Sequence, residues 1–163
     1  MTTLVLGLGN PILTDDGVGI YAVREAAARW QGHDVAFGEA SVGGLRLLDW
    51  LQGCRRAVIV DAIQTGSGTP GDVYRLHLDD LRGRRASPPL HAGSTHDLSL
   101  PGALALGRRL GMELPDDDEI LLLAVEVEDV LSFGEECTPA VAAAIPGVVE
   151  MILAEVGLRQ PGA

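Results

Sequence analysis

The stretch Gly7-Leu8-Gly9-Asn10-Pro11-Ile12-Leu13-Thr14-Asp15-Asp16-Gly17-Val18-Gly19 decides the fold of this chain. An apolar run, Leu4 to Leu8, leads into a tight glycine turn, and two carboxylates then stand at the predicted start of a helix. In an open α/β sheet, ligands bind outside the carboxyl ends of the strands. The stretch therefore predicts a strand, a turn and a helix, with a ligand site beside the turn.

Length, composition and charge favour one compact domain that does not bind nucleic acid. The chain has 163 residues, 47% of them hydrophobic, which is enough for one hydrophobic core. Its formal net charge is -11, and it contains no lysine. Nucleic-acid binding needs clustered cations, so that function class is disfavoured. We interpret the basic clusters, Arg55-Arg56 and residues 82–85, as solvated loop or strand-entry residues rather than as a polyanion site.

The cysteine pattern favours a reducing compartment. Cys54 and Cys137 are far apart in the sequence and fit no metal-binding spacing, so we expect two ordinary buried thiols in a cytoplasmic protein. The sequence shows neither a secretory signal pattern nor an apolar run approaching the roughly 18 residues that a membrane span needs. We therefore expect a soluble, unexported protein.

Hydrophobic periodicity predicts alternating strands and helices. In the segment 17–29, apolar residues recur at helical spacing, and Asp15 or Asp16 is a candidate N-cap. The expected strands are 4–8, 33–40, 57–60, 72–78 and 120–127. The expected helices are 17–29, 45–51, 98–110 and a last one that begins at Thr138-Pro139 and is kinked at Pro146.

The connection from residue 62 to residue 71 predicts a mixed sheet. It is rich in Gly, Thr and Ser, and it is shorter than the dozen or more residues that a parallel crossover needs. We therefore predict an α/β fold with a mixed five-stranded sheet in the order of about 2-1-3-4-5, its fourth strand antiparallel. The segments 82–93 and 126–137 are expected to be long surface loops, which are often functional.

Two acidic residues and one histidine form the candidate site. Asp16 follows the first strand and Asp61 ends the third, and a flavodoxin-like strand order makes these strands neighbours. Both carboxylates would then project into one crevice. His96 stands just before the 98–110 helix, after a loop that contains Gly and Pro. Two carboxylates and one imidazole suit a borderline divalent metal such as Ni, Zn or Fe(II), with positions left for substrate.

Each of these residues also has a purely structural interpretation. Asp16 can be an N-cap, Asp61 can stabilise a turn, and His96 can be an ordinary helix-start or surface histidine. The three residues together indicate a metal site more specifically than any one of them does alone. Asp15 is expected to cap the helix or to orient its neighbour. No recognisable ligand spacing surrounds the remaining histidines, His33, His77 and His91.

Several familiar catalytic signatures do not occur in the sequence. The chain contains no HExxH, no GxSxG elbow and no GxxxxGK[ST] P-loop. The turn Gly7-Leu8-Gly9 lacks the third glycine of a dinucleotide-binding GxGxxG, because Ile12 stands there. These absences disfavour the common zinc proteases, serine hydrolases, P-loop nucleoside triphosphatases and dinucleotide-binding proteins.

Three motifs stand in register along the chain. They are Gly7-Leu8-Gly9-Asn10 with Asp15-Asp16-Gly17-Val18-Gly19, then Val58-Ile59-Val60-Asp61-Ala62, then Ser94-Thr95-His96-Asp97-Leu98, followed in order by the Leu-Ala-Val-Glu-Val strand from Leu123 and the Thr138-Pro139 helix start. With these motifs the chain resembles the [NiFe]-hydrogenase maturation endopeptidases over roughly residues 3 to 157. That family consists of nickel-dependent processing proteases that trim the C-terminal tail of the hydrogenase large subunit.

The resemblance implies a fold and a set of site residues. The fold would be a three-layer α/β/α sandwich of the phosphorylase/hydrolase type, formed by residues 1–163 as a single domain of this family. Asp16, Asp61 and His96 would be both the catalytic and the metal-contacting residues. Some members have Glu at the first of these positions, and Asp here keeps the carboxylate with a shorter reach.

The resemblance also implies an activity and a partner. Nickel would arrive with the large-subunit precursor, and other divalent metals such as Zn or Cd could occupy the same site. The implied reaction is metal-assisted peptide hydrolysis by an aspartic or metal-assisted endopeptidase, in which one Asp serves as base. Which Asp does so stays open. The family is usually monomeric, and it implies neither a nucleic-acid nor a membrane partner.

Two other functions compete with this interpretation. Residues 5–11 also resemble the opening of peptidyl-tRNA hydrolases, but that family places a catalytic His where this chain has Thr14-Asp15-Asp16-Gly17, and a tRNA substrate favours a basic surface. Alternatively, a non-catalytic nickel-checking protein could use the same three residues to bind the metallated large subunit without hydrolysis. The sequence leaves that alternative open.

Overall fold

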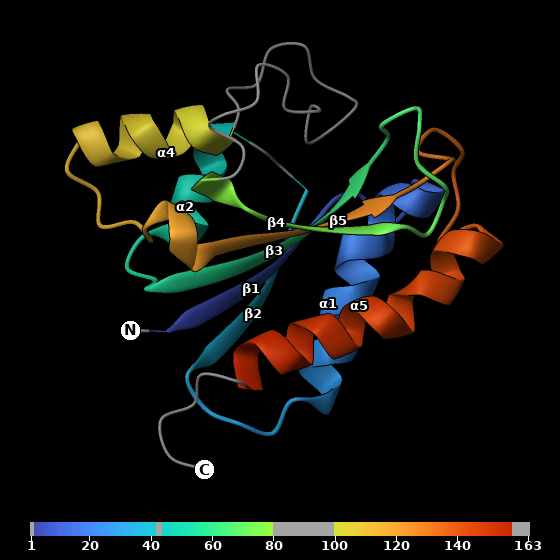
Figure 1. Cartoon of the computed structure of the whole chain (residues 1–163), viewed down its shortest axis with the longest axis horizontal. Helices are drawn as coiled ribbons and strands as arrows, with labels where there is room; N and C mark the ends of the chain where they lie inside the picture. The colour runs from blue at the N-terminus through green and yellow to red at the C-terminus, as the bar shows by residue number, and fades with distance from the viewer. Residues whose placement is uncertain (1, 42–43, 80–99, 158–163) are drawn as a thin grey trace.

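A mixed sheet forms the centre of the structure, a computed structural model that describes residues 2–41, 44–79 and 100–157 (Figure 1). Within these residues the sheet has five strands in the order β2-β1-β3-β5-β4. Neighbouring strands are parallel except β4, which pairs antiparallel with β5. The strands are β1 (Thr3–Leu8), β2 (Val35–Ala40), β3 (Arg56–Ile63), β4 (Val73–His77) and β5 (Ile120–Glu126).

Burial follows the position of each strand in the sheet. Every residue of the central strands β3 and β5 is buried, as expected for near-continuous apolar runs covered on both faces. The edge strands β2 and β4 have exposed or half-buried positions along most of their length. The central strands therefore carry the core. Two buried acidic residues near their carboxyl ends stand out: Asp61, two residues before the end of β3, and Glu126, the last residue of β5.

Helices cover both faces of the sheet and complete three layers (Figure 1). One face packs under α1 (Val18–Arg29) and α5 (Pro139–Gly157), which contact each other. The opposite face packs under α2 (Leu47–Leu51) and α4 (Leu100–Arg109). Each face has its own cluster of buried aliphatic side chains, one around Val58 and Leu123 and the other around Leu6 and Ile59.

The predicted α/β sandwich with a mixed five-stranded sheet and an antiparallel fourth strand is confirmed, and the structure refines the order of its last two strands. The predicted order of about 2-1-3-4-5 becomes 2-1-3-5-4. The wholly buried β5 pairs parallel with β3 and fills the inner position, whereas β4, which contains the exposed Arg75, stays at the edge. The connection 62–71 therefore reverses the direction of the chain, as predicted. The strand that follows it, β4, pairs with β5 rather than with β3.

Helix α5 is long and apolar enough to pass a length-and-composition test for a membrane span, the only helix of the described segments to do so. In this fold one side of the helix packs into the core, and 33% of the residues in the tested window are buried. Its buried side chains, including Val148 and Ile152, join the α1 cluster. Its Glu155, 8% exposed, forms an ion pair with Arg56, which is 4% exposed. Arg56 thus begins a strand as expected, but it is buried and paired, not solvated.

Candidate active site

The turn after β1 is shaped by glycines that let α1 approach the sheet. Gly9 has φ 131°, and a Cβ there would overlap the carbonyl oxygen of Asp16. A Cβ at Gly7 would lie 2.5 Å from the carbonyl oxygen of Gly19. A Cβ at Gly19 would in turn overlap the carbonyl oxygen of Val60 in β3. Glycine is required here because backbone packs directly against backbone.

Asp16 is oriented by this turn. It lies in the short 3-10 segment Thr14–Gly17, and its Oδ2 atom accepts a hydrogen bond of 2.8 Å from the backbone N–H of Asn10. The side chain is only half-buried, and within the described segments its Oδ1 atom accepts no hydrogen bond. The N-cap of α1 is Gly17, and no side chain caps it, so the expectation that Asp15 or Asp16 would cap this helix is wrong. Asp16 therefore keeps an oxygen available for another partner.

Asp61 projects from the carboxyl half of β3. Its side chain is 2% exposed, and Oδ1 accepts a hydrogen bond of 2.8 Å from the N–H of Ala62. In the register of the sheet, Gly7 of β1 pairs with Val60, directly before Asp61. A buried carboxylate is costly unless it is stabilised by hydrogen bonds or a cation. Its position is typical of a functional residue at the end of a parallel strand.

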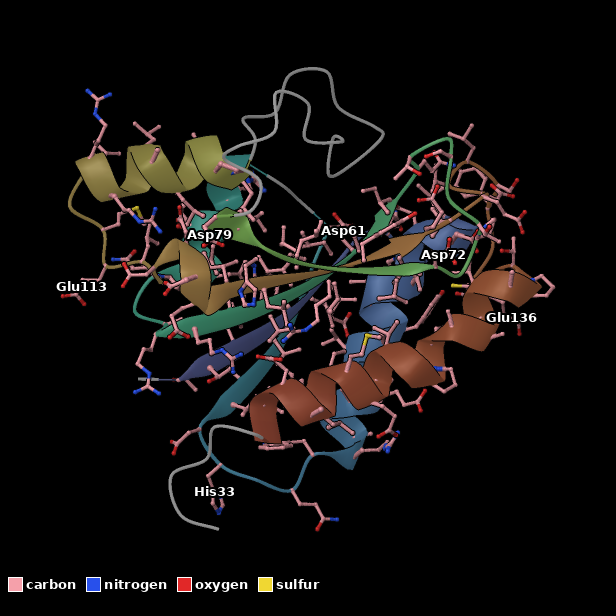
Figure 2. All side chains as sticks on the ribbon, viewed as in Figure 1. His33, Asp61, Asp72, Asp79, Glu113 and Glu136 are labelled. Atoms are coloured by element: carbon pink, nitrogen blue, oxygen red, sulfur yellow. The ribbon has the colours of Figure 1, made fainter. Side chains whose placement is uncertain are left out.

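The structure brings Asp16 and Asp61 to the same edge of the sheet. The 3-10 segment that holds Asp16 follows β1 and contacts β3, and Asp61 lies in the carboxyl half of β3, the parallel neighbour of β1. Figure 2 shows Asp61 beside the sheet, well separated from Asp79 at the end of β4. His96, the third predicted ligand, and His91 lie outside the described residues. Within the described ranges, His, Cys, Asp and Glu side chains form no group of three able to hold a metal ion.

Asp15 has a different task from its neighbour. It is 0% exposed, and its carboxylate accepts hydrogen bonds from the backbone N–H groups of Glu128, Asp129 and Thr138 at 2.7 to 3.1 Å. The Thr138 hydroxyl donates to the same carboxylate. Asp15 thus joins the turn after β1 to the loop after β5 and to the first turn of α5. These contacts reach across the fold and none of them involves Asp16, so the expectation that Asp15 orients its neighbour stays a prediction.

Two titratable side chains, Cys137 and Tyr21, are partly buried near the hydrogen bonds of Asp15 and lie near negative charge. Burial, and to a lesser extent the Asp15 carboxylate, raises the pKa of the Cys137 thiol to about 11. Burial, followed by the nearby Cys137, also raises the pKa of Tyr21. The Tyr21 hydroxyl lies 2.5 Å from the Pro11 carbonyl and 2.6 Å from the Glu135 carbonyl, so it bridges the two loops. Cys137 is therefore a protonated thiol, and both cysteines are unpaired and half-buried.

Sequence analysis missed the role of Glu126 at the end of β5. Its side chain is 3% exposed, and Oε1 accepts hydrogen bonds from the N–H and the hydroxyl of Thr65 at 3.0 and 2.9 Å. Within the described part of the chain, its buried Oε2 atom has no hydrogen-bond partner. Glu126 therefore orders the connection that follows Asp61. The signal that could have found it is the one that found Asp61, a charge that ends an apolar strand.

The fold agrees with comparisons to known proteins. A family model described as hydrogenase maturation protease matches residues 20–155. The chain belongs to the hydrogenase maturation protease family. The hydrogenase 2 maturation protease of Escherichia coli (strain K12) is 30% identical over 165 residues, which cover 99% of this chain and 93% of that protein.

Solved structures of this family share the architecture. The hydrogenase maturating endopeptidase HybD from Escherichia coli aligns with a TM-score of 0.76 at 28% identity, over 97% of this chain and 93% of that one. The [NiFe] hydrogenase maturation protease HybD from Thermococcus kodakarensis aligns with a TM-score of 0.63 at 26% identity, over 98% of this chain and 100% of that one. The chain spans 65% of the length of a further relative, the hydrogenase expression/formation protein HupD of Thiocapsa roseopersicina, at 28% identity.

Proposed function

We propose that this family member is an endopeptidase that removes the C-terminal extension of a [NiFe]-hydrogenase large-subunit precursor after nickel insertion. The observation that carries the proposal is the placement of two carboxylates at the ligand-binding edge of the sheet, Asp61 in β3 and Asp16 in the 3-10 segment that follows the neighbouring parallel strand β1 and contacts β3. Membership of the hydrogenase maturation protease family supports a hydrolase that acts in this process.

The two carboxylates are suited to contact a cation that a substrate brings with it. Asp16 is fixed by the Asn10 N–H through one oxygen, and its other oxygen accepts no hydrogen bond within the described segments. Asp61 adds a second, buried carboxyl group at the same edge of the sheet. Two carboxylates and one imidazole make an incomplete set of ligands, which leaves positions for ligands from the substrate. His96 would supply the imidazole, a role that rests on the Ser94-Thr95-His96-Asp97-Leu98 motif.

In this proposal nickel is part of the substrate, bound to the precursor when it arrives. When bound between the two proteins, the ion supplies Lewis-acid polarisation of the scissile carbonyl or of a water molecule. Asp16 or Asp61 accepts the proton of the attacking water, since a carboxylate close to the scissile bond is a competent general base. The unpaired, protonated thiols are compatible with a protein of the reducing cytoplasm, the location that we propose.

The decisive experiment mixes the protein with large-subunit precursor that has or has not received nickel, and follows the C-terminal extension by mass spectrometry. We expect cleavage at one peptide bond only with the nickel-loaded precursor. Cleavage that is equally fast without nickel would contradict the proposal that the precursor brings the metal. Tight binding of the loaded precursor without loss of the extension would favour a nickel-checking protein over a protease.

A further inference from the structure

Three large apolar side chains lie exposed on two loops next to the candidate active site. Ile12 is 47% exposed, and Leu131 and Phe133 are each 85% exposed. Ile12 belongs to the turn after β1, and the other two belong to the loop between β5 and α5. We call these three residues the apolar tip. Large exposed apolar groups gathered in one place are typical of interaction sites.

Hydrogen bonds between the loops hold the apolar tip in place. The N–H of Gly134 donates to the carbonyl of Ile12 at 2.9 Å, and the N–H of Thr14 donates to the carbonyl of Gly134 at 3.0 Å. The Thr14 hydroxyl donates to the carbonyl of Ser132 at 2.6 Å. The N–H groups of Leu131 and Ser132 both donate to the carboxylate of Asp129. A partner would therefore meet an ordered surface, so less conformational entropy is lost on binding.

The apolar tip continues directly into the site. Ile12 and Asp16 belong to one turn, and the backbone N–H of Asp15 donates to the carbonyl of Asp129 at 2.9 Å. Leu131 follows Asp129 by two residues in the same loop. A polypeptide bound across Asp16 would thus reach the apolar tip without leaving the surface of these two loops.

Charge around the apolar tip indicates the chemistry of its partner. The segment 128–137 contains four acidic residues and no basic one. Glu128, Glu135 and Glu136 are exposed within it. Figure 2 shows Glu136 at the end of α5, at the same end of the fold as Asp72 and away from Asp79. A partner that covers the apolar tip must therefore offer apolar side chains flanked by positive charge.

We propose that the apolar tip docks a segment of the substrate polypeptide in which apolar side chains lie between arginine or lysine residues. This inference rests on the proposed function, because it places the substrate next to Asp16. Ile12, Leu131 and Phe133 supply the apolar contacts, and the surrounding carboxylates supply charge that steers the basic partner toward the site. The apolar tip determines which proteins are held long enough to be cut.

The test measures KM, kcat and the Kd for nickel-loaded precursor with a Leu131→Ser/Phe133→Ser variant. We expect KM and Kd to rise about tenfold or more, as for loss of anchor residues at an interface, while kcat follows the parent. Leu110→Ser is the matched control, because Leu110 is 71% exposed but follows α4 on the other face of the sheet.

A second variant, Glu135→Gln/Glu136→Gln, tests the role of the charge. Its rate constant for association with the precursor should be lower than that of the parent and should depend less on salt concentration.

The readouts separate this inference from the proposed function. Unchanged KM and Kd in the Leu131→Ser/Phe133→Ser variant, with normal cleavage by the parent, would overturn the docking role and leave the protease intact. A parent that binds precursor through the apolar tip but never cleaves it would retain the docking role and overturn the protease. Equal weakening by Leu110→Ser would also overturn the docking role, since a general loss of apolar surface would then explain the effect.

Discussion

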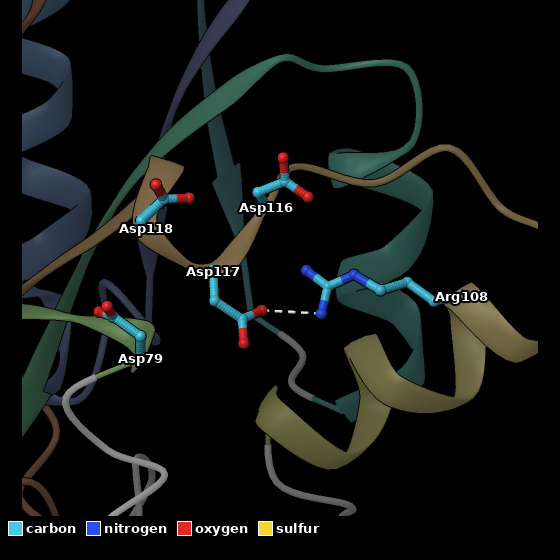
Figure 3. A pocket seen from close by; sticks show the side chains of 5 residues that line it. All are labelled: Asp79, Arg108, Asp116, Asp117 and Asp118. Atoms are coloured by element: carbon cyan, nitrogen blue, oxygen red, sulfur yellow. Dashed lines mark ion pairs between the residues drawn. The ribbon is translucent and has the colours of Figure 1, made fainter.

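Two acidic regions lie at opposite ends of the sheet, and they hold their carboxylates in different ways. At the carboxyl edge of the parallel strands, Asp15, Asp16 and Asp61 are buried or half-buried and accept hydrogen bonds from backbone N–H groups. At the other edge, a cavity of about 480 Å³ lies where β4 ends and β5 begins (Figure 3). The residues that line this cavity are Asp79, Arg108, Asp116, Asp117 and Asp118.

The difference shows that the number of carboxylates does not locate the active site. In the cavity, Arg108 pairs with Asp117 at 2.7 Å and donates to the carbonyl of Pro115, while Asp116 and Asp118 are exposed. Exposed carboxylates of this kind are solvated and have little influence on stability. Asp15, Asp16 and Asp61 instead occupy positions that cost free energy unless the fold or a ligand compensates. Our predictions test this comparison from its largest expected effect to its smallest.

The largest effect is expected at the carboxyl edge, for the substitutions Asp16→Asn, Asp61→Asn and His96→Ala. Each should leave nickel-loaded precursor uncut, with a loss of roughly 100-fold or more in cleavage rate, because each removes a group that contacts or stabilises charge at the reacting centre. Mass spectrometry of the precursor measures the rate, and circular dichroism checks that the variants fold. If any one variant processes precursor at the parental rate, the role assigned to the substituted residue is wrong.

A smaller effect, on stability, is expected for Asp15→Ala. The substitution leaves the N–H groups of Glu128, Asp129 and Thr138 without their acceptor, which should lower the free energy of unfolding by about 3 kcal/mol. Urea denaturation measures the loss. Asp118→Ala in the exposed cavity is the matched control. Equal losses in both variants would show that burial and hydrogen bonding do not distinguish the two regions.

The smallest effect is expected for Asp116→Asn/Asp118→Asn. Both side chains are exposed, so this variant should keep the parental cleavage rate within about twofold and the parental free energy of unfolding within about 0.5 kcal/mol. The same cleavage and urea assays apply. A large fall in the cleavage rate would indicate that the active site lies at the cavity rather than at the carboxyl edge of the sheet.

Sequence reasoning located Asp16 and Asp61 because both follow the ends of apolar strands, and the parallel topology then made those strands neighbours. It could not place β5 beside β3, since wholly apolar runs are interchangeable until their helices pack. It also could not separate the roles of Asp15 and Asp16. Adjacent identical residues differ only through contacts made elsewhere, and Asp15 contacts Thr138, which is 123 residues away. The role predicted for His96 stays a prediction.

The glycines at positions 7, 9 and 19 have a consequence for how the enzyme meets its substrate. At these positions carbonyl oxygens occupy the space that a Cβ would need, so no side chain can rearrange to change the spacing between the first helix and the sheet. Asp61 belongs to the sheet, and Asp16, whose carbonyl oxygen packs against Gly9, lies in the 3-10 segment that leads into the first helix. Their relative placement is thus preorganised before any substrate arrives, so the cation binding that we propose would require little reorganisation energy.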